Sequence, residues 1–250
     1  MTFTPSTQRG FTLVELSIVM IIIGLLIGGV LKGQELIENA KAKRIMADVK
    51  AYQSSILVFK DSFSYLPGDI PYPETLLPKC SGTPSCVSSG GNGDSFIGTK
   101  NVSNWSHNNQ SAIGSEPSKF WIHLMAADLV SGVSGRNVAE WGELYPASPM
   151  GGGFQVAHIY ETGANQASGH YLILRLMPTG DPHPTTPDSA VLKPRIAEML
   201  DARYDNSIPN TGSIITDAGT GDGCWAISNN VITFNTASGQ RTCISAFQFY

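Results

Sequence analysis

An unbroken apolar run near the start of the chain constrains its fold more than any other feature. From Phe11 to Leu31 the sequence contains one charged residue, Glu15. A helix of about 20 apolar residues is long enough to cross the hydrocarbon core of a bilayer, so we expect residues 11–31 to form a membrane-spanning helix. A carboxylate inside such a span costs about 2.5–3.5 kcal/mol on insertion scales and less near the interface. Glu15 is therefore expected either to find a positively charged partner or to reach the headgroup level.

The segment Gly10–Ser17, G-F-T-L-V-E-L-S, lies where this run begins. It resembles the prepilin-type cleavage and methylation motif, which is carried by type IV pilins and by the pseudopilins of type II secretion. The resemblance implies that residues 1–10 are a leader peptide, that prepilin peptidase cuts between Gly10 and Phe11, and that Phe11 is then N-methylated. It also implies that Glu15 is the acidic residue used in filament assembly. Cleavage would create an α-amine at Phe11, and the amine of one subunit could neutralise Glu15 of its neighbour.

The same resemblance implies a function and a location. It implies a structural subunit that residues 11–31 hold in the inner membrane, with its globular domain in the periplasm, before extraction into a type IV pilus or a type II secretion pseudopilus. Its partners would be prepilin peptidase, other pilin or pseudopilin subunits and an inner-membrane assembly platform, and no enzymatic activity is expected. Two alternatives use the same membrane helix. One is a membrane-anchored periplasmic binding protein or enzyme, and the other is a tip adhesin, for which Trp105 and Trp141 are the only indication.

The flanking charges do not by themselves predict this orientation. Arg9 is the only charged residue before the run, whereas four basic residues follow it within residues 32–44, and the positive-inside rule would place that side in the cytoplasm. We favour the opposite orientation because of the pilin resemblance and the cysteines, and because Glu35 and Glu38 interrupt the basic residues. A cleaved secretory signal is a poorer interpretation, since the run is longer than a usual signal core and only Gly28-Gly29 offers a weak cleavage site.

The glycines of the span favour close packing of membrane helices. Gly24 and Gly28 form one G-x-x-x-G pair, and Gly29 and Gly33 form another; such pairs let helices approach one another closely. Major pilins usually carry a proline further along this helix, and here the corresponding region, residues 28–32, has none. This difference from the family pattern favours a pseudopilin or a minor component.

Beyond the span, residues 32–63 continue the helical pattern as an amphipathic stretch. Apolar residues recur at steps of four and three, which places them along one face of a helix. They are Ile45, Val49, Tyr52, Ile56, Phe59 and Phe63. We expect this face to pack on the chain's own globular domain, residues 64–250, which is long enough to build a core. The motif L-P-G-D, Leu66–Asp69, is expected to end the helix; together with G-G-N-G-D at Gly90–Asp94 it resembles a poorly characterised group of pilin-motif proteins.

The globular domain is expected to have an α+β fold, in which an antiparallel β-sheet packs on the second half of the long helix. Amphipathic patterns and proline positions predict helices over Pro117–Val130 and Pro194–Tyr204. Runs of apolar and β-branched residues predict strands. These are Phe154–Tyr160, His170–Met177, Ile214–Thr216, Cys224–Ile227, Val231–Phe234 and Cys243–Phe249, with Gly163–Gly169 joining the first two as a hairpin.

The four cysteines lie beyond the membrane segment, and their even number indicates two disulfides. Four cysteines allow three connectivities, and the sequence does not choose among them. Short loops are the easiest to close, which favours Cys80 with Cys86 and Cys224 with Cys243. The second loop also resembles the C-terminal disulfide loop of many pilins. No C-x-x-C occurs, so neither a zinc site nor thioredoxin-like chemistry is indicated.

Composition and motifs give little indication of chemistry. The net charge is −4 and 14% of the residues are charged, and no basic run outside residues 41–44 indicates nucleic-acid binding. The five histidines form no metal-ligand spacing, and no nucleophile elbow or phosphate-binding loop occurs. No cofactor is expected except calcium, which takes carboxylate and amide oxygens. The candidate ligands are Asp201, Asp205, Asn206, Asp217 and Asp222, with Asn92 and Asp94 as a weaker second set, although caps and turns use the same residue types.

Overall fold

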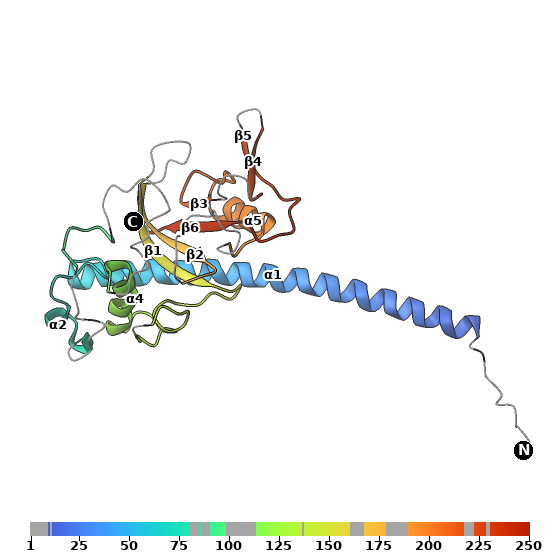
Figure 1. Cartoon of the computed structure of the whole chain (residues 1–250), viewed down its shortest axis with the longest axis horizontal. Coiled ribbons are helices and arrows are strands. Elements are labelled where there is room, and N and C mark those ends of the chain that lie inside the picture. Colours follow the sequence, from blue (N-terminus) through green and yellow to red (C-terminus); the bar gives the residue numbers. More distant parts are fainter. Residues whose placement is uncertain are drawn as a thin grey trace, which may run out of the picture. The chain divides into compact units, whose positions relative to one another are not determined.

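Figure 1 shows the computed structural model of the chain. It describes all residues except 1–9, 11, 81–85, 87–90, 99–113, 137, 161–167, 179–189, 218–222 and 229–230. The chain divides into two compact units, Met1–Ala40 and Lys41–Tyr250. The first helix, α1, spans Leu13–Phe63 and so contributes residues to both units. This long helix matches the sequence prediction for residues 11–63, and it ends where Ser64 takes a positive φ of 62°.

In the second unit, the apolar face of α1 packs on the globular domain as predicted. Ile45, Val49, Ile56 and Phe59 are buried, while Tyr52 and Phe63 are partly buried against the same core. The Tyr52 ring lies edge-on to two rings from other elements, at 5.0 Å from Trp121 and 5.4 Å from Phe154. Aromatic pairs with this geometry add to the stabilisation from buried area, so the heptad-like pattern marks an intramolecular contact here.

A four-stranded antiparallel sheet forms the centre of the second unit. Its order is β1-β2-β6-β3. The strands are β1 (Gly153–Tyr160), β2 (Ser168–Arg175), β3 (Ile214–Asp217) and β6 (Ile244–Gln248). The register pairs Leu172 with both Val156 and Phe247, and all three lie in the core that includes the face of α1. This arrangement confirms the expected α+β fold. The proposed hairpin connection Gly163–Gly169 lies mostly outside the described residues.

Of the other two predicted helices in the second unit, one has the predicted bounds and the other is shorter than predicted. α5 spans Pro194–Tyr204, as the proline position indicated. α4 spans Glu116–Ala126 and ends four residues before the predicted Val130, which is a correction. The reason is Asp128, which takes a left-handed φ of 59°. The Leu129 and Asp128 N–H groups then donate to the carbonyls of Leu124 and Met125, both at 3.0 Å, a Schellman ending that usually has glycine in place of Asp128.

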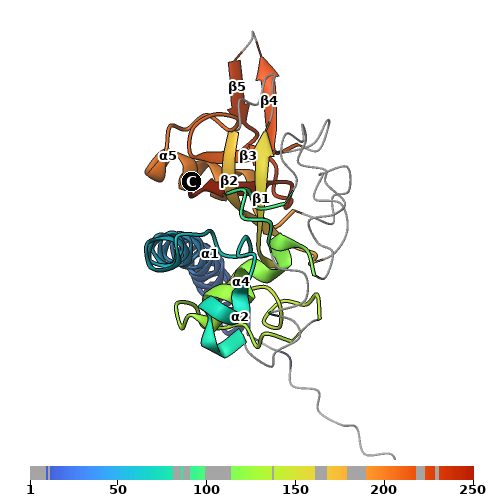
Figure 2. The same cartoon turned by 90° about the vertical axis from the view of Figure 1, so that its left-hand side faces the viewer.

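Two short helices and a separate hairpin complete the described elements. α2 spans Pro73–Leu76 and the 3-10 helix η1 spans Pro78–Cys80, between α1 and α4. β4 (Trp225–Ser228) and β5 (Val231–Phe234) form a two-stranded antiparallel sheet of their own. In Figures 1 and 2 this hairpin stands at the edge of the second unit, away from α1.

The two motifs L-P-G-D and G-G-N-G-D contact each other. The buried carboxylate of Asp69 accepts hydrogen bonds from the N–H groups of Gly93, at 2.7 Å, and Ser95, at 2.8 Å. A Cβ atom on Gly91 would lie 2.2 Å from the Asp69 Cα atom, so only glycine fits there. The Gly68 N–H donates to Nδ1 of His123 on α4 at 2.9 Å. The motifs therefore join the end of α1 and the loop at 91–98 to α4.

Candidate functional site

The first turn of α1 contains a reciprocal capping arrangement. Thr12 immediately precedes the helix, and its backbone N–H and its hydroxyl both donate to Oε2 of Glu15, each at 2.9 Å. The Glu15 N–H in turn lies 3.3 Å from the Thr12 hydroxyl oxygen. This is a capping box, in which residues three apart satisfy each other's backbone N–H groups at a helix start. Sequence reasoning missed it, although the T-x-x-E spacing of Thr12 and Glu15 is the known signal.

The capping box holds Glu15 in a defined position at the beginning of the helix. Both bonds go to Oε2, and no described residue donates to Oε1. The side chain is exposed, so Oε1 is open to a donor from outside the chain. The helix N-terminus itself favours a negative charge at this position. Glu15 is thus an oriented acceptor with one oxygen atom available.

The predicted cleavage position lies directly before this turn. Gly10 is exposed, and a Cβ atom built on it would meet nothing within 4 Å. Packing within the chain therefore does not require glycine there, which leaves recognition by another molecule as a reason for it. Phe11, the residue expected to become the new N-terminus, lies outside the described residues, as do residues 1–9 of the expected leader.

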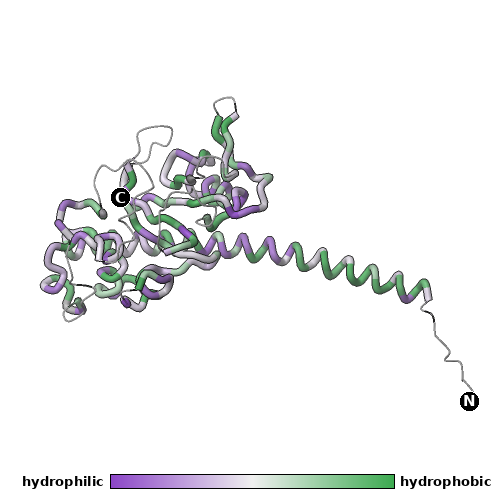
Figure 3. Tube along the Cα trace, in the orientation of Figure 1, coloured by the Kyte–Doolittle hydropathy of each residue, from purple (hydrophilic) through white to green (hydrophobic). Residues whose placement is uncertain are grey.

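The apolar part of α1 in the first unit exposes its side chains on all sides. Leu13 is 87% exposed and Leu25 is 74% exposed, and Figure 3 shows the apolar residues following one another along this part of the helix. α1 is the one helix among the described residues that is long and apolar enough to cross a membrane. Such a surface is unstable in water, so this segment needs a bilayer or other apolar helices around it.

The glycines of this segment are not used by the chain itself. Cβ atoms on Gly24, Gly28, Gly29 and Gly33 would all meet nothing within 4 Å. α1 nevertheless stays helical through all four positions, although each glycine costs about 1 kcal/mol relative to alanine. Small residues at this spacing allow a second helix to approach closely. The segment therefore offers a surface that suits contact between helices.

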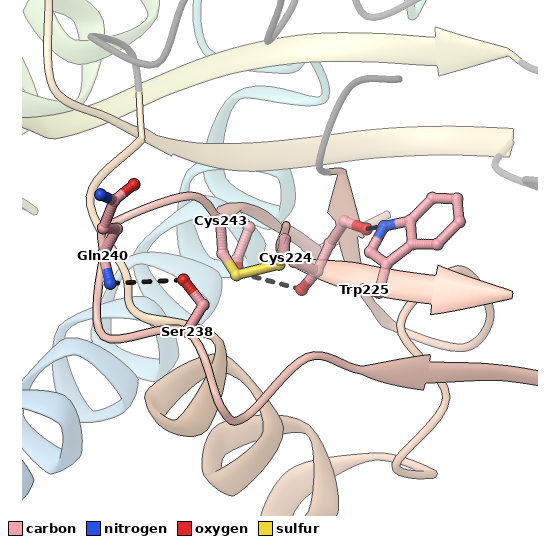
Figure 4. Close-up of a disulfide and its surroundings, with 7 residues drawn as sticks. Cys224, Trp225, Ser238, Gln240 and Cys243 are labelled. Atoms are coloured by element: carbon pink, nitrogen blue, oxygen red, sulfur yellow. Dashed lines mark hydrogen bonds between the residues drawn. A yellow bond between two sulfur atoms is a disulfide. The ribbon is translucent and has the colours of Figure 1, made fainter. Parts of the chain in front are cut away.

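The two disulfides join the pairs that short loops favour. Cys80 pairs with Cys86 and Cys224 with Cys243, with a Cα–Cα distance of 5.2 Å in each case. Figure 4 shows that the second bridge joins the residue before β4 to the residue before β6. In the loop between them, the Gln240 N–H donates to the Ser238 hydroxyl at 3.4 Å. The bridge fixes the base of the β4–β5 hairpin on the larger sheet.

One cluster of metal-ligand types occurs among the described residues. Ligand atoms of Cys80, Cys86 and His123 lie within 4.8 Å of one another. Both sulfur atoms belong to the disulfide, and Nδ1 of His123 accepts the Gly68 N–H. Burial lowers the pKa of His123 to about 4, so the ring is neutral at pH 7. The cluster is therefore a packed structural contact in its oxidised form.

The first calcium candidate, Asp201, is a buried loop cap. Its Oδ1 atom accepts hydrogen bonds from the N–H groups of Asn206, at 3.2 Å, and Ser207, at 2.5 Å. Burial raises the pKa of Asp201 to about 6, and the nearby Asp205 carboxylate acts in the same direction. These bonds close the turn that follows α5, which is a role that aspartate often takes.

The other described calcium candidates also accept hydrogen bonds from backbone N–H groups. Oδ2 of Asp205 accepts the Ile214 N–H at 2.9 Å, and Oδ1 of Asn206 accepts the Ile208 N–H at 2.8 Å. The side chain of Asp217 and the whole of Asp222 lie outside the described residues. In the second set, Oδ1 of Asn92 accepts the Asp94 N–H and Oδ1 of Asp94 accepts the Phe96 N–H, both at 2.9 Å. One oxygen of each described candidate accepts a nearby backbone N–H, and calcium binding stays a prediction.

Three other side chains considered above, those of His158, His170 and Trp141, are also used inside the fold. His158 and His170 face each other across β1 and β2 with ring centroids 4.9 Å apart, and both are buried. Trp141, one of two aromatics considered for an adhesin, is half-buried and donates from its indole N–H to the Leu176 carbonyl at 2.9 Å. His107, His183 and Trp105 lie outside the described residues.

Comparison with known proteins bears on the N-terminal segment alone. Residues 5–31 match the family model described as the prokaryotic N-terminal methylation motif. This is the prepilin-type motif of type IV pilins and pseudopilins, and it covers Gly10, Thr12 and Glu15. No curated protein and no solved structure matches the chain. Chains with this motif are processed by prepilin peptidase and assemble with other pilins.

Proposed function

We propose that this prepilin-type precursor is a structural subunit of a type IV pilus or a type II secretion pseudopilus. The observation that carries the proposal is the position of Glu15, one helical turn from the cleavage position, oriented by Thr12 and with Oε1 open. The subunit is first anchored in the inner membrane by residues 11–31 and cut after Gly10. Its work is mechanical, and it carries no covalent chemistry of its own.

Assembly follows from the two properties of the N-terminal segment of α1. Its apolar surface moves from lipid into contact with the same surface of other subunits, so no apolar area is exposed to water during extraction. Cleavage creates an α-amine at Phe11, and that amine in one subunit meets Oε1 of Glu15 in a neighbour. Each charge alone would be costly in an apolar surrounding, whereas the pair is neutral and hydrogen-bonded.

The kind of subunit follows from the continuity of α1. Residues 24–33 are helical and contain glycine but no proline. We propose on this ground that the chain is a pseudopilin or a minor pilin rather than a major pilin. The globular unit then decorates the outside of the filament, facing the periplasm before extraction.

A matched pair of substitutions on α1 tests the proposal. Glu15→Ala removes the carboxylate, and we expect normal membrane insertion and cleavage with loss of the assembled form, measured as the pelletable filament fraction from sheared or gently lysed cells. Glu35→Ala is the control, because it removes a carboxylate from the same helix at a position beyond the apolar run, and the ion pair of Glu35 with Lys32, at 2.7 Å, is of a kind that contributes little. A membrane-anchored monomeric binding protein or enzyme would be insensitive to both changes, and that result would contradict the proposal.

A further inference from the structure

The β4–β5 hairpin has an anchored base and an exposed tip. At the base, the Trp225 indole N–H donates to the Thr216 carbonyl at 3.1 Å, and Phe234 is 8% exposed. At the tip, Ile227 is 61% exposed and Val231 is 57% exposed. The disulfide described above fixes the same base. The hairpin is therefore held firmly at one end and presents apolar residues at the other.

The outer edges of the larger sheet are both covered by other segments of the chain. At β1, the His158 N–H donates to the Ile97 carbonyl at 3.3 Å. At β3, the Thr216 N–H donates to the Pro209 carbonyl at 2.6 Å. Covering an edge strand in this way prevents it from pairing with another chain. In the described part of the chain, β4 and β5 pair only with each other, so the small sheet lacks this cover.

The hairpin also lacks the usual protection by sequence. From Gly223 to Gln240 there is no charged residue and no proline, the residue types that normally block edge pairing. The register runs without a bulge from Trp225 opposite Phe234 to Ser228 opposite Val231. A regular, uncharged edge is a template for another strand. Since α5 packs against β5, β4 carries the more accessible edge.

We propose that the outer edge of β4 is an interaction surface for a second copy of this chain, with the two β4 strands pairing antiparallel. Two identical antiparallel edges are self-complementary about a two-fold axis. The charge distribution favours a copy as the partner. The chain has a net charge of −4, so two copies generally repel, but the uncharged segment Gly223–Gln240 lets them meet without opposed like charges.

The expected contact is weak in dilute solution. Two four-residue strands bury far less than the roughly 1,200 Å² of a typical stable interface. Anchoring in one membrane, which rests on the proposed function, raises the effective concentration of the copies. The contact does not involve Glu15, so it forms whether or not filaments assemble.

The hydrogen-bond pattern between β4 and β5 identifies a backbone N–H group that points to the outer edge of β4 and takes no part in pairing with β5. The Asn235 N–H donates to the Cys224 carbonyl at 2.8 Å. Because hydrogen-bonded pairs alternate along an antiparallel ladder, the N–H groups of Ala226 and Ser228 point inward and that of Ile227 points outward. Ile227→Pro therefore removes an edge donor without breaking the ladder, and Ile227→Thr keeps the donor.

Site-specific photocrosslinking of the full chain in its membrane tests the proposal. A photoreactive phenylalanine at Ser228 is expected to give a covalent dimer that contains two differently tagged copies, both in the parent chain and with Glu15→Ala. The same probe at the exposed Arg203 of α5 is expected to give none. Adding Ile227→Pro should remove most of the dimer, and Ile227→Thr should keep it. A crosslink to a different protein, no dimer, or a dimer insensitive to Ile227→Pro would overturn the proposal.

Discussion

Thr12 and Glu15 cap each other at the start of α1, with the backbone N–H and the hydroxyl of Thr12 both 2.9 Å from the same oxygen of Glu15. The acidic residue of the prepilin-type motif therefore has a structural task before any partner arrives. Neither bond involves residues 1–10, so both groups remain after the proposed cleavage. The capping box uses one oxygen of Glu15, and in the proposed assembly the other oxygen would accept the amine of a neighbouring subunit.

This relationship predicts a graded effect of substitutions at Thr12. Thr12→Val removes the hydroxyl that holds the carboxylate but keeps the backbone N–H donor. We expect the assembled fraction to fall severalfold, by less than for Glu15→Ala, because Glu15 is still present but less well oriented. Thr12→Ser keeps a hydroxyl and should assemble normally. The pelletable fraction, normalised to the cleaved protein in the membrane, measures the effect. Assembly of Thr12→Val at the level of Thr12→Ser and the parent chain would show that the cap is irrelevant.

The contact between the two glycine-containing motifs predicts a marked loss of stability for Asp69→Asn. Asp69 is 1% exposed and accepts the N–H groups of Gly93 and Ser95. An asparagine would place an NH₂ group against one of these donors, and leaving buried groups unpaired costs about 1–3 kcal/mol. Asp94→Asn is the control, since Asp94 is exposed and asparagine can still accept the Phe96 N–H. Urea unfolding of the full chain in detergent, followed by tryptophan fluorescence, compares the two; equal midpoints would contradict this account.

Stability should fall on acidification through the pH range in which His123 titrates in the unfolded chain. Burial lowers the pKa of His123 in the fold to about 4, against about 6.5 when unfolded. Between these values the unfolded chain binds a proton that the folded chain does not, so the free energy of unfolding decreases as the pH drops from about 6.5 toward 4. Asp201, whose pKa is raised to about 6, acts in the opposite direction. His123→Asn keeps an acceptor for Gly68 and should flatten the slope measured by urea unfolding; an unchanged slope would contradict the assignment.

The two disulfides should differ in their contribution to stability. The loops that they close have sequence separations of 19 residues for Cys224–Cys243 and 6 residues for Cys80–Cys86. In the chain-entropy model, such loops correspond to about 3 and about 2 kcal/mol. The paired alanine variant at Cys224 and Cys243 should therefore unfold at lower urea concentration than that at Cys80 and Cys86. The reverse order would show that local packing beside His123 outweighs loop length.

Elements with strong local signals could be predicted from the sequence. The apolar stripe of α1 follows from spacing alone, and Pro194 marks the start of α5. The end of α4 could not be predicted because Asp128 takes a left-handed conformation in which glycine is usual. The contact between His158 and His170 depends on the register of β1 and β2, and their separation in sequence gives no indication of it.

In the candidate site, too, only the features with a local sequence signal could be predicted. The motif at Gly10–Ser17 is local, and it predicts the cleavage position and singles out Glu15. The capping partner Thr12 was missed because the carboxylate was considered only as a charge in an apolar span. Asp201 and Asp205 are candidate calcium ligands because cation sites and loop caps use the same oxygen atoms, and calcium binding stays a prediction. Only the folded chain shows that backbone N–H groups already occupy oxygens of both.

Intact mass spectrometry of the full-length protein, from cells with and without prepilin peptidase, tests the central claim most directly. The account predicts that residues 1–10 are lost and one methyl group is gained at Phe11 in the presence of the peptidase, and that the chain stays uncut and unmethylated in its absence. An uncut chain in both cells, or a cut near Gly29, would contradict it and would favour a membrane-anchored or secreted binding protein.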